Sequence, residues 1–524
     1  MANLKAVRGT RDLLPPETAL WNRIEATARA VFARYNFGEI RTPIFEDTSL
    51  FARGVGEETD IVSKEMYTWE DGERFDKEKL RAEWLRIKEP QISGASPTST
   101  FADWDCEFLD GHAEAVLFSS QATQAAAKIL ADGVALAPSW QRLSGKIVVP
   151  STTGQPSIEP LSGNVWVERI PGSFNKSSQS LTLRPENTAG VVRAYIEHKL
   201  GETGQLQKLY YIGPQFRRER PQKGRYRQFY QIGAEVIGPP SSGSESPLRD
   251  AEVLEMLATL LDELGITGWT LELNSVGSAA DRARYNEVLR AALEPLAPKM
   301  CADCQRRAVT NPLRVLDCKV PEDQPLIASL PMIAESLDDD SKAHFAAVMA
   351  ALDAAGVPYV RNDRLVRGLD YYTRTTFEFT HGGLGAQNAL LGGGRYDGLS
   401  EAIGGPKAPG IGFAMGEDRL VLTLLAQEVA AAQLGDAYIA PLGEGMNAAA
   451  LKLARELRRD GLRVELGDGS FRLKKSFDAA EKTARRIVIL GEDELQSGIL
   501  TVKDFASGVQ TKIPRTDLAA FLAG

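Results

Sequence analysis

A short, strongly basic stretch is the most informative feature of this sequence. Between Arg217 and Arg227, six cations and one anion give a net charge of +5, whereas the whole chain carries −9. Apolar, strand-like segments flank it at 209–212 and 229–237, and Pro221 interrupts it. This pattern predicts two antiparallel strands joined by a long basic loop. Guanidinium groups match phosphate oxygens, so the loop suits a polyphosphate or a nucleic-acid end, unless it is only a solvated hairpin tip.

The strand that follows the loop carries a second group of polar residues. Gln231, Gly233 and Glu235 are spaced two apart, so their side chains lie on one face of the strand. A glycine between an amide and a carboxylate leaves room for a small ligand. Glu235 can accept a hydrogen bond from a cationic or N–H-bearing group of that ligand.

The residue order in this stretch resembles motif 2 of the class II aminoacyl-tRNA synthetases, in the form found in histidyl-tRNA synthetases. Other segments resemble motifs of the same family, in the family's order, and together they cover nearly the whole chain except roughly residues 73–178. They are Val7-Arg-Gly-Thr-Arg-Asp-Leu-Leu-Pro-Pro-Glu17, Arg41-Thr-Pro-Ile-Phe-Glu46 (similar to motif 1), Leu183-Arg-Pro-Glu-Asn-Thr188, Arg364-Leu-Val-Arg-Gly-Leu-Asp-Tyr-Tyr-Thr-Arg374 (similar to the histidine-specific motif), Leu391-Gly-Gly-Gly-Arg-Tyr-Asp-Gly398 and Gly410-Ile-Gly-Phe-Ala-Met-Gly-Glu-Asp-Arg419 (similar to motif 3).

The resemblance implies roles for four arginines in forming an aminoacyl adenylate, a step that depends on positioning and on neutralising phosphate charge. Arg217 matches the arginine that grips the α-phosphate and the substrate carboxylate, and Arg367 matches the one that stands at the α-phosphate. Arg419 matches the arginine at the far end of the triphosphate, and Arg225 matches a further phosphate contact. The candidate catalytic residues are therefore Arg217, Arg367 and Arg419, and the candidate ATP ligands are Arg217, Arg225 and Arg419.

The same resemblance implies which residues select histidine. Glu186 and Thr188, together with Gln231, match residues that bind the α-amino group, and Asn187 stands beside them where the family usually has glycine. Glu235 and Tyr372, with Tyr371 and Tyr396 nearby, match the residues around the imidazole, whose N–H needs an acceptor. The candidate histidine-binding residues are Glu186, Asn187, Thr188, Arg217, Gln231, Glu235, Arg367, Tyr371, Tyr372 and Tyr396.

Two further groups of residues concern tRNA. Arg220 and Gln222 lie where bacterial members of the family read the end of the acceptor stem. Lys474 and Lys475 belong to a segment, 472–486, whose six cations and two anions suit anticodon-stem phosphates, unless they form a solvated helix face. The family pattern is also broken just before the motif 3 arginine. Asp418 replaces the usual glutamate, and Glu417 is unusual there.

An α+β fold must position these residues. The resemblance implies a class II catalytic domain, an antiparallel sheet flanked by helices, followed by a C-terminal α/β anticodon-binding domain. Apolar spacing predicts an amphipathic helix over 16–35 and a strand over 40–45 that Pro43 interrupts. In the family, the latter segment packs against its copy in a second subunit, which implies a homodimer.

The chain divides by composition and resemblance into several regions. We expect the catalytic domain in residues 1–72, 179–297 and 357–430, a helical insertion near the tRNA acceptor arm in 298–356, an atypical insert of unknown role in 73–178 and the anticodon-binding domain in 435–524. After Gly435 the pattern alternates as βαβαβ. Within the insert we expect helical stretches at 76–88 and 113–132 and polar loops at 91–100 and 150–164.

Composition excludes several classes of protein. With 43% hydrophobic and 25% charged residues the chain is typical of soluble globular proteins. It shows no secretory signal and no apolar run of the ~18 residues that a membrane span requires, so we expect a cytoplasmic protein without a membrane partner. A pI of about 5.4 argues against an indiscriminate nucleic-acid binder.

Three of the four cysteines are clustered in the sequence. Cys301 and Cys304 form a C-x2-C pair, and Cys318 follows, whereas Cys106 lies in a different segment. Such a set could ligate zinc, but no fourth ligand is obvious and reduced, unligated thiols are the favoured interpretation. We therefore assign no metal ligand among the candidate site residues.

The sequence thus predicts a histidine–tRNA ligase that uses ATP with Mg²⁺ and no organic cofactor, and whose partners are ATP, L-histidine, tRNA(His) and a second copy of the chain. One alternative is a non-catalytic histidine-binding paralogue, similar to the regulatory subunit of ATP phosphoribosyltransferase. That alternative predicts degraded motifs and no anticodon-binding domain, whereas all motif arginines are present here. A tRNA-sensing module would need an attached effector domain, and none fits in this length.

Overall fold

The computed structural model describes residues 4–56, 59–71, 104–108, 114–119, 139–149, 157–169, 179–222, 224–384, 388–427 and 434–524. The chain divides into two compact units, one of residues 1–41, 194–215 and 219–524 and the other of residues 42–193 and 216–218. In the described part of the chain we find no helix whose length and apolar character would let it cross a membrane.

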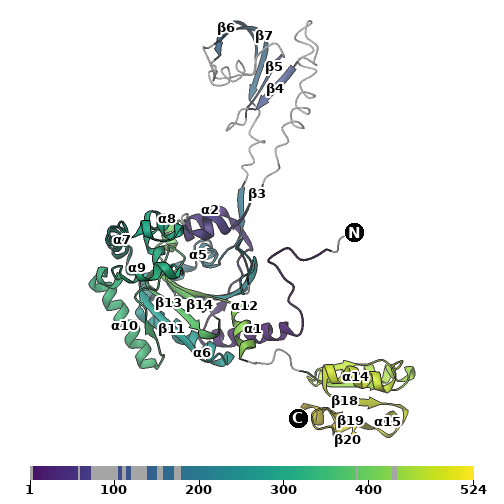
Figure 1. Cartoon of the computed structure of the whole chain (residues 1–524). Coiled ribbons are helices and arrows are strands. Elements are labelled where there is room, and N and C mark those ends of the chain that lie inside the picture. Colours follow the sequence, from purple (N-terminus) through teal and green to yellow (C-terminus); the bar gives the residue numbers. More distant parts are fainter. Residues whose placement is uncertain are drawn as a thin grey trace. The chain divides into compact units, whose positions relative to one another are not determined.

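The first unit contains an eight-stranded sheet, with strand order β1-β9-β10-β15-β14-β13-β11-β12. Three of its strands, β11, β13 and β14, are labelled in Figure 1. The strands from β10 to β11 pair antiparallel, and the short edge strands β1 and β12 pair parallel to β9 and β11. The predicted antiparallel sheet is therefore confirmed. The bounds are β1 (Gly38–Glu39), β9 (Gln207–Phe216), β10 (Gln228–Ile237), β11 (Trp269–Ser275), β12 (Val360–Arg361), β13 (Thr373–His381), β14 (Ala389–Arg395) and β15 (Gly410–Gly416).

Helices cover one face of this sheet and form its core. Ile232 of β10, Phe413 of β15 and Phe377 of β13 are buried there among the apolar side chains of four helices. These are α1 (Glu17–Arg34), α6 (Pro247–Leu264), α10 (Asp339–Ala355) and α12 (Glu417–Ala426), seen together in Figure 1. The helix predicted over 16–35 is confirmed, and its buried residues recur every three or four positions, as an amphipathic helix requires.

A second, smaller core lies in the mostly helical segment that follows β11. It joins Tyr285 and Leu289 of one helix to Val315, Ile327 and Ile333 further along the chain. The elements are α7 (Ala279–Leu293), α8 (Ala302–Thr310), α9 (Gln324–Ala328) and the 3-10 turns η7 (Pro312–Asp317), η8 (Pro321–Asp323) and η9 (Ile333–Ser336). The capping box of Ser278 and Asp281 starts α7.

Residues 435–524 form a separate five-stranded sheet, of order β17-β16-β18-β19-β20, with helices on both faces. The predicted βαβαβ alternation is confirmed, and two antiparallel strands that the sequence pattern missed complete the sheet. The elements are β16 (Gly435–Pro441), α13 (Asn447–Arg459), β17 (Val464–Leu466), α14 (Leu473–Thr483), β18 (Ala484–Leu490), α15 (Glu492–Ser497), β19 (Ile499–Asp504), β20 (Gln510–Pro514) and α16 (Leu518–Ala523).

The second unit contains two smaller sheets, one of three strands (β2-β8-β3) and one of four antiparallel strands (β4-β5-β7-β6). Its elements are β2 (Phe45–Asp47), α2 (Thr48–Val55), the π-helical turn η1 (Ile61–Glu65), β3 (Tyr67–Asp71), β4 (Trp104–Phe108), β5 (Glu114–Ser119), β6 (Ser139–Val149), β7 (Ser157–Arg169), β8 (Gln179–Leu183) and α5 (Thr188–Glu197), which continues into the first unit.

Three sequence-based expectations in this unit are corrected. The strand expected over 40–45 is absent apart from its last residue, because Pro43 cannot donate to a ladder and strand β2 starts only at Phe45. The helix expected over 113–132 is wrong for 114–119, which pairs as β5, and the loop expected over 150–164 is wrong for 157–164, which belongs to β7. The stretches at 76–88, 91–100 and 120–132 lie outside the described residues.

Candidate active site

The face of the eight-stranded sheet opposite the helical core is lined by glycines. Glu235 of β10 lies opposite Gly412 of β15, which in turn lies opposite Gly394 of β14. Gln231 lies opposite Gly416 in the same ladder. Residues that are directly opposite share a face, so Gln231 and Glu235 look out over strands that present almost no side chains.

Two charged side chains lie directly against this glycine surface. A Cβ atom on Gly412 would stand 1.7 Å from Oε2 of Glu235, and one on Gly392 would stand 2.5 Å from Nη1 of Arg367. Both distances are far below contact distance, so any side chain at either position would displace the charged group. The glycines therefore create the space in which Glu235 and Arg367 reside.

Tyrosine rings cover the next glycines along the same strands. A Cβ on Gly394 would stand 2.8 Å from Cδ1 of Tyr372, and one on Gly410 would stand 2.5 Å from Cε2 of Tyr396. The ring centroid of Tyr371 lies 4.8 Å from that of Tyr372 and 6.0 Å from that of Tyr396. The three tyrosines predicted to meet the imidazole thus form one aromatic cluster.

The buried hydroxyl of Tyr396 remains protonated. Burial raises the pKa of Tyr396 well above its ordinary value, and the negative charge of Glu235 raises it further. A phenol that keeps its proton beside a carboxylate supplies a hydrogen-bond donor and an acceptor within one small region, which is what the two different nitrogens of a neutral imidazole require.

Three arginines of the first unit influence one another electrostatically. Nη1 of Arg367 donates to Oε1 of Glu378 at 2.9 Å; burial works against the charge, but Glu378 outweighs it and the pKa of Arg367 is raised. Arg419 donates to the carbonyl of Ala389 at 2.7 Å. Burial lowers the pKa of Arg419, and the positive charges of Arg225 and Arg367 lower it further. A bound polyanion would relieve this repulsion.

The basic loop between β9 and β10 presents its predicted tRNA contacts to solvent. Arg220 and Gln222 are exposed, and Gln222 exchanges backbone hydrogen bonds of 3.1 and 2.9 Å with Arg225. Nη1 of Arg225 also donates to Oε2 of Glu219 at 3.1 Å. The loop is therefore locally ordered while its outer side chains stay available.

The N-terminal motif braces this loop, a role that the sequence did not reveal. The backbone N–H of Arg227 donates to the carbonyl of Gly9 at 2.7 Å, and Gly9 has a φ of +90°, which favours glycine. Arg11 donates to Oδ1 of Asp418 at 2.9 Å and lies over the ring of Tyr226 at 4.8 Å. Asp418, which departs from the family pattern, is thus a structural ion-pair partner of Arg11.

Its neighbour Glu417 is fully buried, and neither carboxylate oxygen has a hydrogen-bond partner among the described residues. Burial raises the pKa of Glu417 to about 8, with further contributions from Glu25 and Asp418. This side chain is therefore protonated at neutral pH and does not add negative charge to the site.

Arg395, in the segment 391–398, serves the fold. It is completely buried, and its Nε donates to both carboxylate oxygens of Asp250 at 3.1 and 3.2 Å. Its Nη1 donates to the carbonyl of Ser244 at 2.9 Å and to Asp397 at 3.0 Å. The ion pair joins β14 to α6 behind the glycine-lined face.

The second unit holds the other predicted substrate residues. Glu186 is buried and accepts from the backbone N–H groups of Thr188 at 2.8 Å and Ala189 at 3.0 Å, at the start of α5. Burial raises the pKa of Glu186, although these N–H groups and Arg217 oppose the shift. Nε of Arg217 donates to the carbonyl of Pro185 at 2.8 Å. The carboxylate and the guanidinium therefore influence each other across one short loop.

Asn187 is engaged differently from its neighbours. Its Oδ1 accepts from the hydroxyl of Thr42 at 2.6 Å, and its Nδ2 is buried without a hydrogen-bond partner among the described residues. The expectation that Asn187 binds histidine therefore depends on that one remaining amide donor.

In the C-terminal sheet domain, Lys474 and Lys475 are exposed on α14. Nζ of Lys475 lies 3.5 Å from the ring centroid of Phe471, which fixes its position by a cation–π contact.

Comparisons with known proteins decide which family this is. The family described as histidyl-tRNA synthetase matches residues 173–420, and the anticodon binding domain family matches residues 436–524. A curated histidine–tRNA ligase of Koribacter versatilis is 59% identical over 520 residues, which cover 99% of this chain and 96% of the relative. The chain belongs to the histidyl-tRNA synthetase family. A second ligase of that name, from Solibacter usitatus, is 46% identical and covers 99% of both chains.

Solved structures of the histidyl-tRNA synthetase family share the fold. The apo enzyme of S. aureus is 31% identical, with a TM-score of 0.65 and full coverage of both chains. That of Nostoc sp. PCC 7120 is 17% identical, with a TM-score of 0.61 over 99% of each chain, and shows likeness of fold alone. Because the Koribacter relative matches 99% of this chain, the aligned part must include most of residues 73–178. The insert that departs from the usual family pattern is thus shared by a close relative.

The sequence predicted the residues of this synthetase site but not the contacts that position their side chains. Within the first unit the structure gathers Glu235, Arg367, Tyr372 and Tyr396 on the glycine-lined face. The sequence pattern missed Glu378, which anchors Arg367, because only strand register reveals that it faces Gly392.

Proposed function

We infer that this chain is a histidine–tRNA ligase. It joins ATP and L-histidine to histidyl-adenylate with release of diphosphate, and then transfers the histidyl group to tRNA(His) with release of AMP. The observation that carries this inference is the 59% identity to a histidine–tRNA ligase over nearly the whole chain. The charged and aromatic residues on the glycine-lined face provide the chemistry that such a reaction needs.

We propose that Arg367 and Arg419 stabilise charge on ATP during attack by the histidine carboxylate. Arg367 is partly buried, held by Glu378 and keeps its charge, so its guanidinium is already oriented before substrate arrives. Arg419 and Arg225 repel each other in the free protein, which favours a ligand carrying several negative charges. Arg217, whose orientation is set by the carbonyl of Pro185, contributes a further contact to phosphate and to the substrate carboxylate.

We propose that Glu235 and the tyrosine cluster recognise the imidazole. The carboxylate of Glu235 accepts from one imidazole N–H, and the protonated hydroxyl of Tyr396 lies close enough to interact with it electrostatically. Tyr371 and Tyr372 supply the ring surfaces. Substrate analogues that lack the N–H leave the buried Glu235 without its ligand and are rejected for that reason.

Three residues are proposed to hold the α-amino group. Glu186 is a buried carboxylate, which attracts an ammonium group, and Thr188 follows it in the same loop. Gln231 acts from β10, on the face that carries Glu235. Asn187 supports them through its free amide donor.

ATP is expected to enter with Mg²⁺. Glu378 pairs with Arg367 and Glu219 pairs with Arg225, so we assign neither carboxylate to the ion. When bound, Mg²⁺ neutralises charge on the departing diphosphate. The phosphates themselves would supply most of its ligands, as is usual for this ion.

For tRNA, we propose that Arg220 and Gln222 contact the acceptor end, and that Lys474 and Lys475 contact phosphates of the anticodon stem. Their exposure and charge support these roles. We further propose that residues 298–356 lie near the acceptor arm, that the catalytic domain comprises residues 1–72, 179–297 and 357–430, and that residues 73–178 are an atypical insert of unknown role.

A cytoplasmic homodimer is also proposed. Ile44, Phe45 and Trp69 are exposed apolar side chains in the second unit, and the rings of Phe45 and Trp69 are in edge contact at 6.1 Å. Exposed apolar side chains of this kind suit an interface between two subunits.

The regulatory-paralogue alternative is not favoured. One similar structure, from Bacillus halodurans, is described as an ATP phosphoribosyltransferase regulatory subunit/histidyl-tRNA synthetase, but at 17% identity and a TM-score of 0.53 it shows the fold alone. Both curated relatives above are ligases by name and far more similar.

The decisive experiment is histidine-dependent ATP–pyrophosphate exchange by the purified chain. Exchange with histidine and with no other amino acid is the expected result. Arg367→Ala should lower kcat/KM for exchange by at least about a hundredfold, because a preorganised charge that stabilises the transition state is lost. Arg361→Ala, on the exposed edge strand β12, is the matched control and should stay within about twofold.

Two outcomes would contradict the proposal. A loss of less than about tenfold in the Arg367→Ala variant would remove this arginine from the catalytic machinery. A folded protein that binds histidine but performs no exchange would favour the regulatory paralogue.

A further inference from the structure

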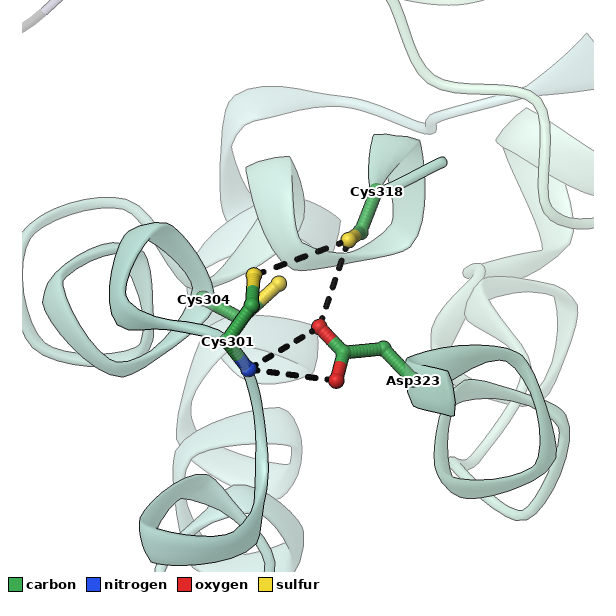
Figure 2. A group of neighbouring side chains, drawn as sticks. All are labelled: Cys301, Cys304, Cys318 and Asp323. Carbon is green, nitrogen blue, oxygen red and sulfur yellow. Dashed lines mark hydrogen bonds between the residues drawn. The ribbon is translucent and has the colours of Figure 1, made fainter. Parts of the chain in front are cut away.

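Four potential metal ligands meet in the small helical core, at residues that the proposed function does not use. Cys301 precedes α8, Cys304 lies in its first turn, Cys318 follows η7 and Asp323 ends η8 (Figure 2). One sulfur atom or carboxylate oxygen from each lies within 4.8 Å of all the others. Asp323 is the fourth group that the spacing of cysteines and histidines in the sequence did not reveal.

The spacing of these atoms suits a tetrahedral ion. Sγ of Cys301 lies 3.9 Å from Sγ of Cys318, and Sγ of Cys318 lies 3.3 Å from Oδ2 of Asp323. With Zn–S bonds of about 2.3 Å and Zn–O bonds of about 2.0 Å, the edges of a tetrahedral zinc site measure about 3.8 Å between sulfurs and about 3.5 Å between sulfur and oxygen. Both observed distances agree with these edges to within a few tenths of an ångström.

Asp323 is a buried residue, 2% exposed. Its carboxylate accepts from the backbone N–H of Cys301 at 3.1 Å and from the thiol of Cys318 at 3.3 Å. No lysine, arginine or histidine in the described ranges forms an ion pair with it. Hydrogen bonds from the N–H of Cys301 and the thiol of Cys318 support this carboxylate, and its oxygens face three sulfurs (Figure 2).

Hydrogen bonds from neighbouring groups already hold the ligands in place. The backbone N–H of Val320 donates to Sγ of Cys318 at 3.4 Å, and the side-chain amide Nε2 of Gln324 donates to the carbonyl of Cys318 at 2.7 Å. Together with the N–H of Cys301 on Asp323, these contacts orient both ligands of the 318–323 loop, as the groups around a metal site commonly do.

We propose that Cys301, Cys304, Cys318 and Asp323 bind one Zn²⁺ ion per chain. Three thiolates favour zinc over magnesium or calcium, and zinc accepts tetrahedral geometry without redox change. Because the protein supplies all four ligands, the site has no open position and is structural. Binding releases the thiol protons to solvent as three S–Zn bonds and one O–Zn bond form.

The ion would support the histidine-specific motif. The small core that contains Cys304 and Cys318 also contains Tyr372, with Leu369 packed against it. Nδ2 of Asn311, which lies between the cysteines in the sequence, donates to Oδ1 of Asp370 at 2.9 Å. Removing zinc should therefore disturb the motif that carries Arg367 and the tyrosines, and raise KM for histidine.

Metal analysis of the full chain, purified with a cleaved tag and without chelators, tests the proposal. The expected result is about one zinc per chain. Asp323→Asn should lower zinc retention after gel filtration in the presence of a competing chelator by about tenfold or more, as for loss of a metal-ligand interaction. Cys106→Ser is the matched control, because Cys106 is the one cysteine outside the cluster, and it should retain the metal.

Cobalt substitution gives a readout that needs no variant. Co²⁺ added to reduced, metal-free protein should give thiolate-to-cobalt charge-transfer bands and the intense visible bands of a tetrahedral site. Zinc-free chains that still bind neither zinc nor cobalt after reduction would overturn the proposal. The intact mass of freshly purified protein gives a second test. A mass two hydrogens below that of the reduced chain, in protein without zinc, would mark a disulfide between cluster cysteines and would also overturn the proposal.

Discussion

Replacing Glu417 by glutamine should stabilise the protein, and should do so increasingly as the pH rises. The carboxyl is fully buried without a hydrogen-bond partner among the described residues, and its pKa is raised to about 8. A group whose folded pKa lies above its unfolded value favours the folded state fully below the unfolded pKa, near pH 4.5. This contribution is lost as the pH rises through about 8.

The magnitude follows from linkage. Each pKa unit of difference corresponds to about 1.4 kcal/mol, and the pKa of Glu417 rises from 4.5 to about 8. Between pH 5 and pH 8 the free energy of unfolding should therefore fall by about 3 kcal/mol through this one group. Glutamine has the same shape and cannot ionise, so Glu417→Gln should remove that part of the pH dependence.

Urea unfolding at pH 5, 7 and 8 measures the effect. The difference in unfolding free energy between variant and parent should grow by about 3 kcal/mol from pH 5 to pH 8. Glu287→Gln, on the exposed side of α7, is the control and should show no such trend. A difference that is the same at all three pH values would refute the reasoning, because the buried carboxyl would then titrate alike in both states.

Three further outcomes test other contacts. Gly412→Ala should raise KM for histidine at least about tenfold, because its methyl group displaces Glu235. Steady-state kinetics measure this, and an unchanged KM for ATP would show that the variant is not misfolded. Arg395→Met should cost about 3–5 kcal/mol in urea unfolding, because Asp250 is left buried and unpaired, and a cost below about 1 kcal/mol would contradict this. Arg11→Met should destabilise by about 2 kcal/mol and hasten proteolysis of the basic loop, and an unchanged cleavage rate would count against the brace.

Much of this fold could be predicted from local patterns. The helix at Glu17–Arg34 and the strand at Gln228–Ile237 have apolar spacings that their own sequence reveals. Local patterns failed where a single feature dominated. Pro43 prevented a strand over 40–45, and alanine-rich composition after residue 113 predicted a helix where β5 pairs with its neighbours.

The candidate site was predicted less completely because its supports are distant in sequence. Motif order identified Arg367 and Glu235, but the partners that hold them depend on strand register, which no single strand encodes. Asp323 was missed for a similar reason. Two 3-10 turns lie between Cys304 and the end of the segment that carries Asp323, and neither turn has a recognisable spacing.

The glycine-lined face limits how the site can change. Its floor is bare backbone at Gly392, Gly394 and Gly412, so no substitution there can enlarge the space available to a substrate; every replacement fills it. Room for a bulkier amino acid could come only from the side chains above, chiefly Glu235 and Tyr396, which are the groups proposed to read the imidazole. Substitutions that widened this site would therefore also remove the groups on which its preference for histidine depends.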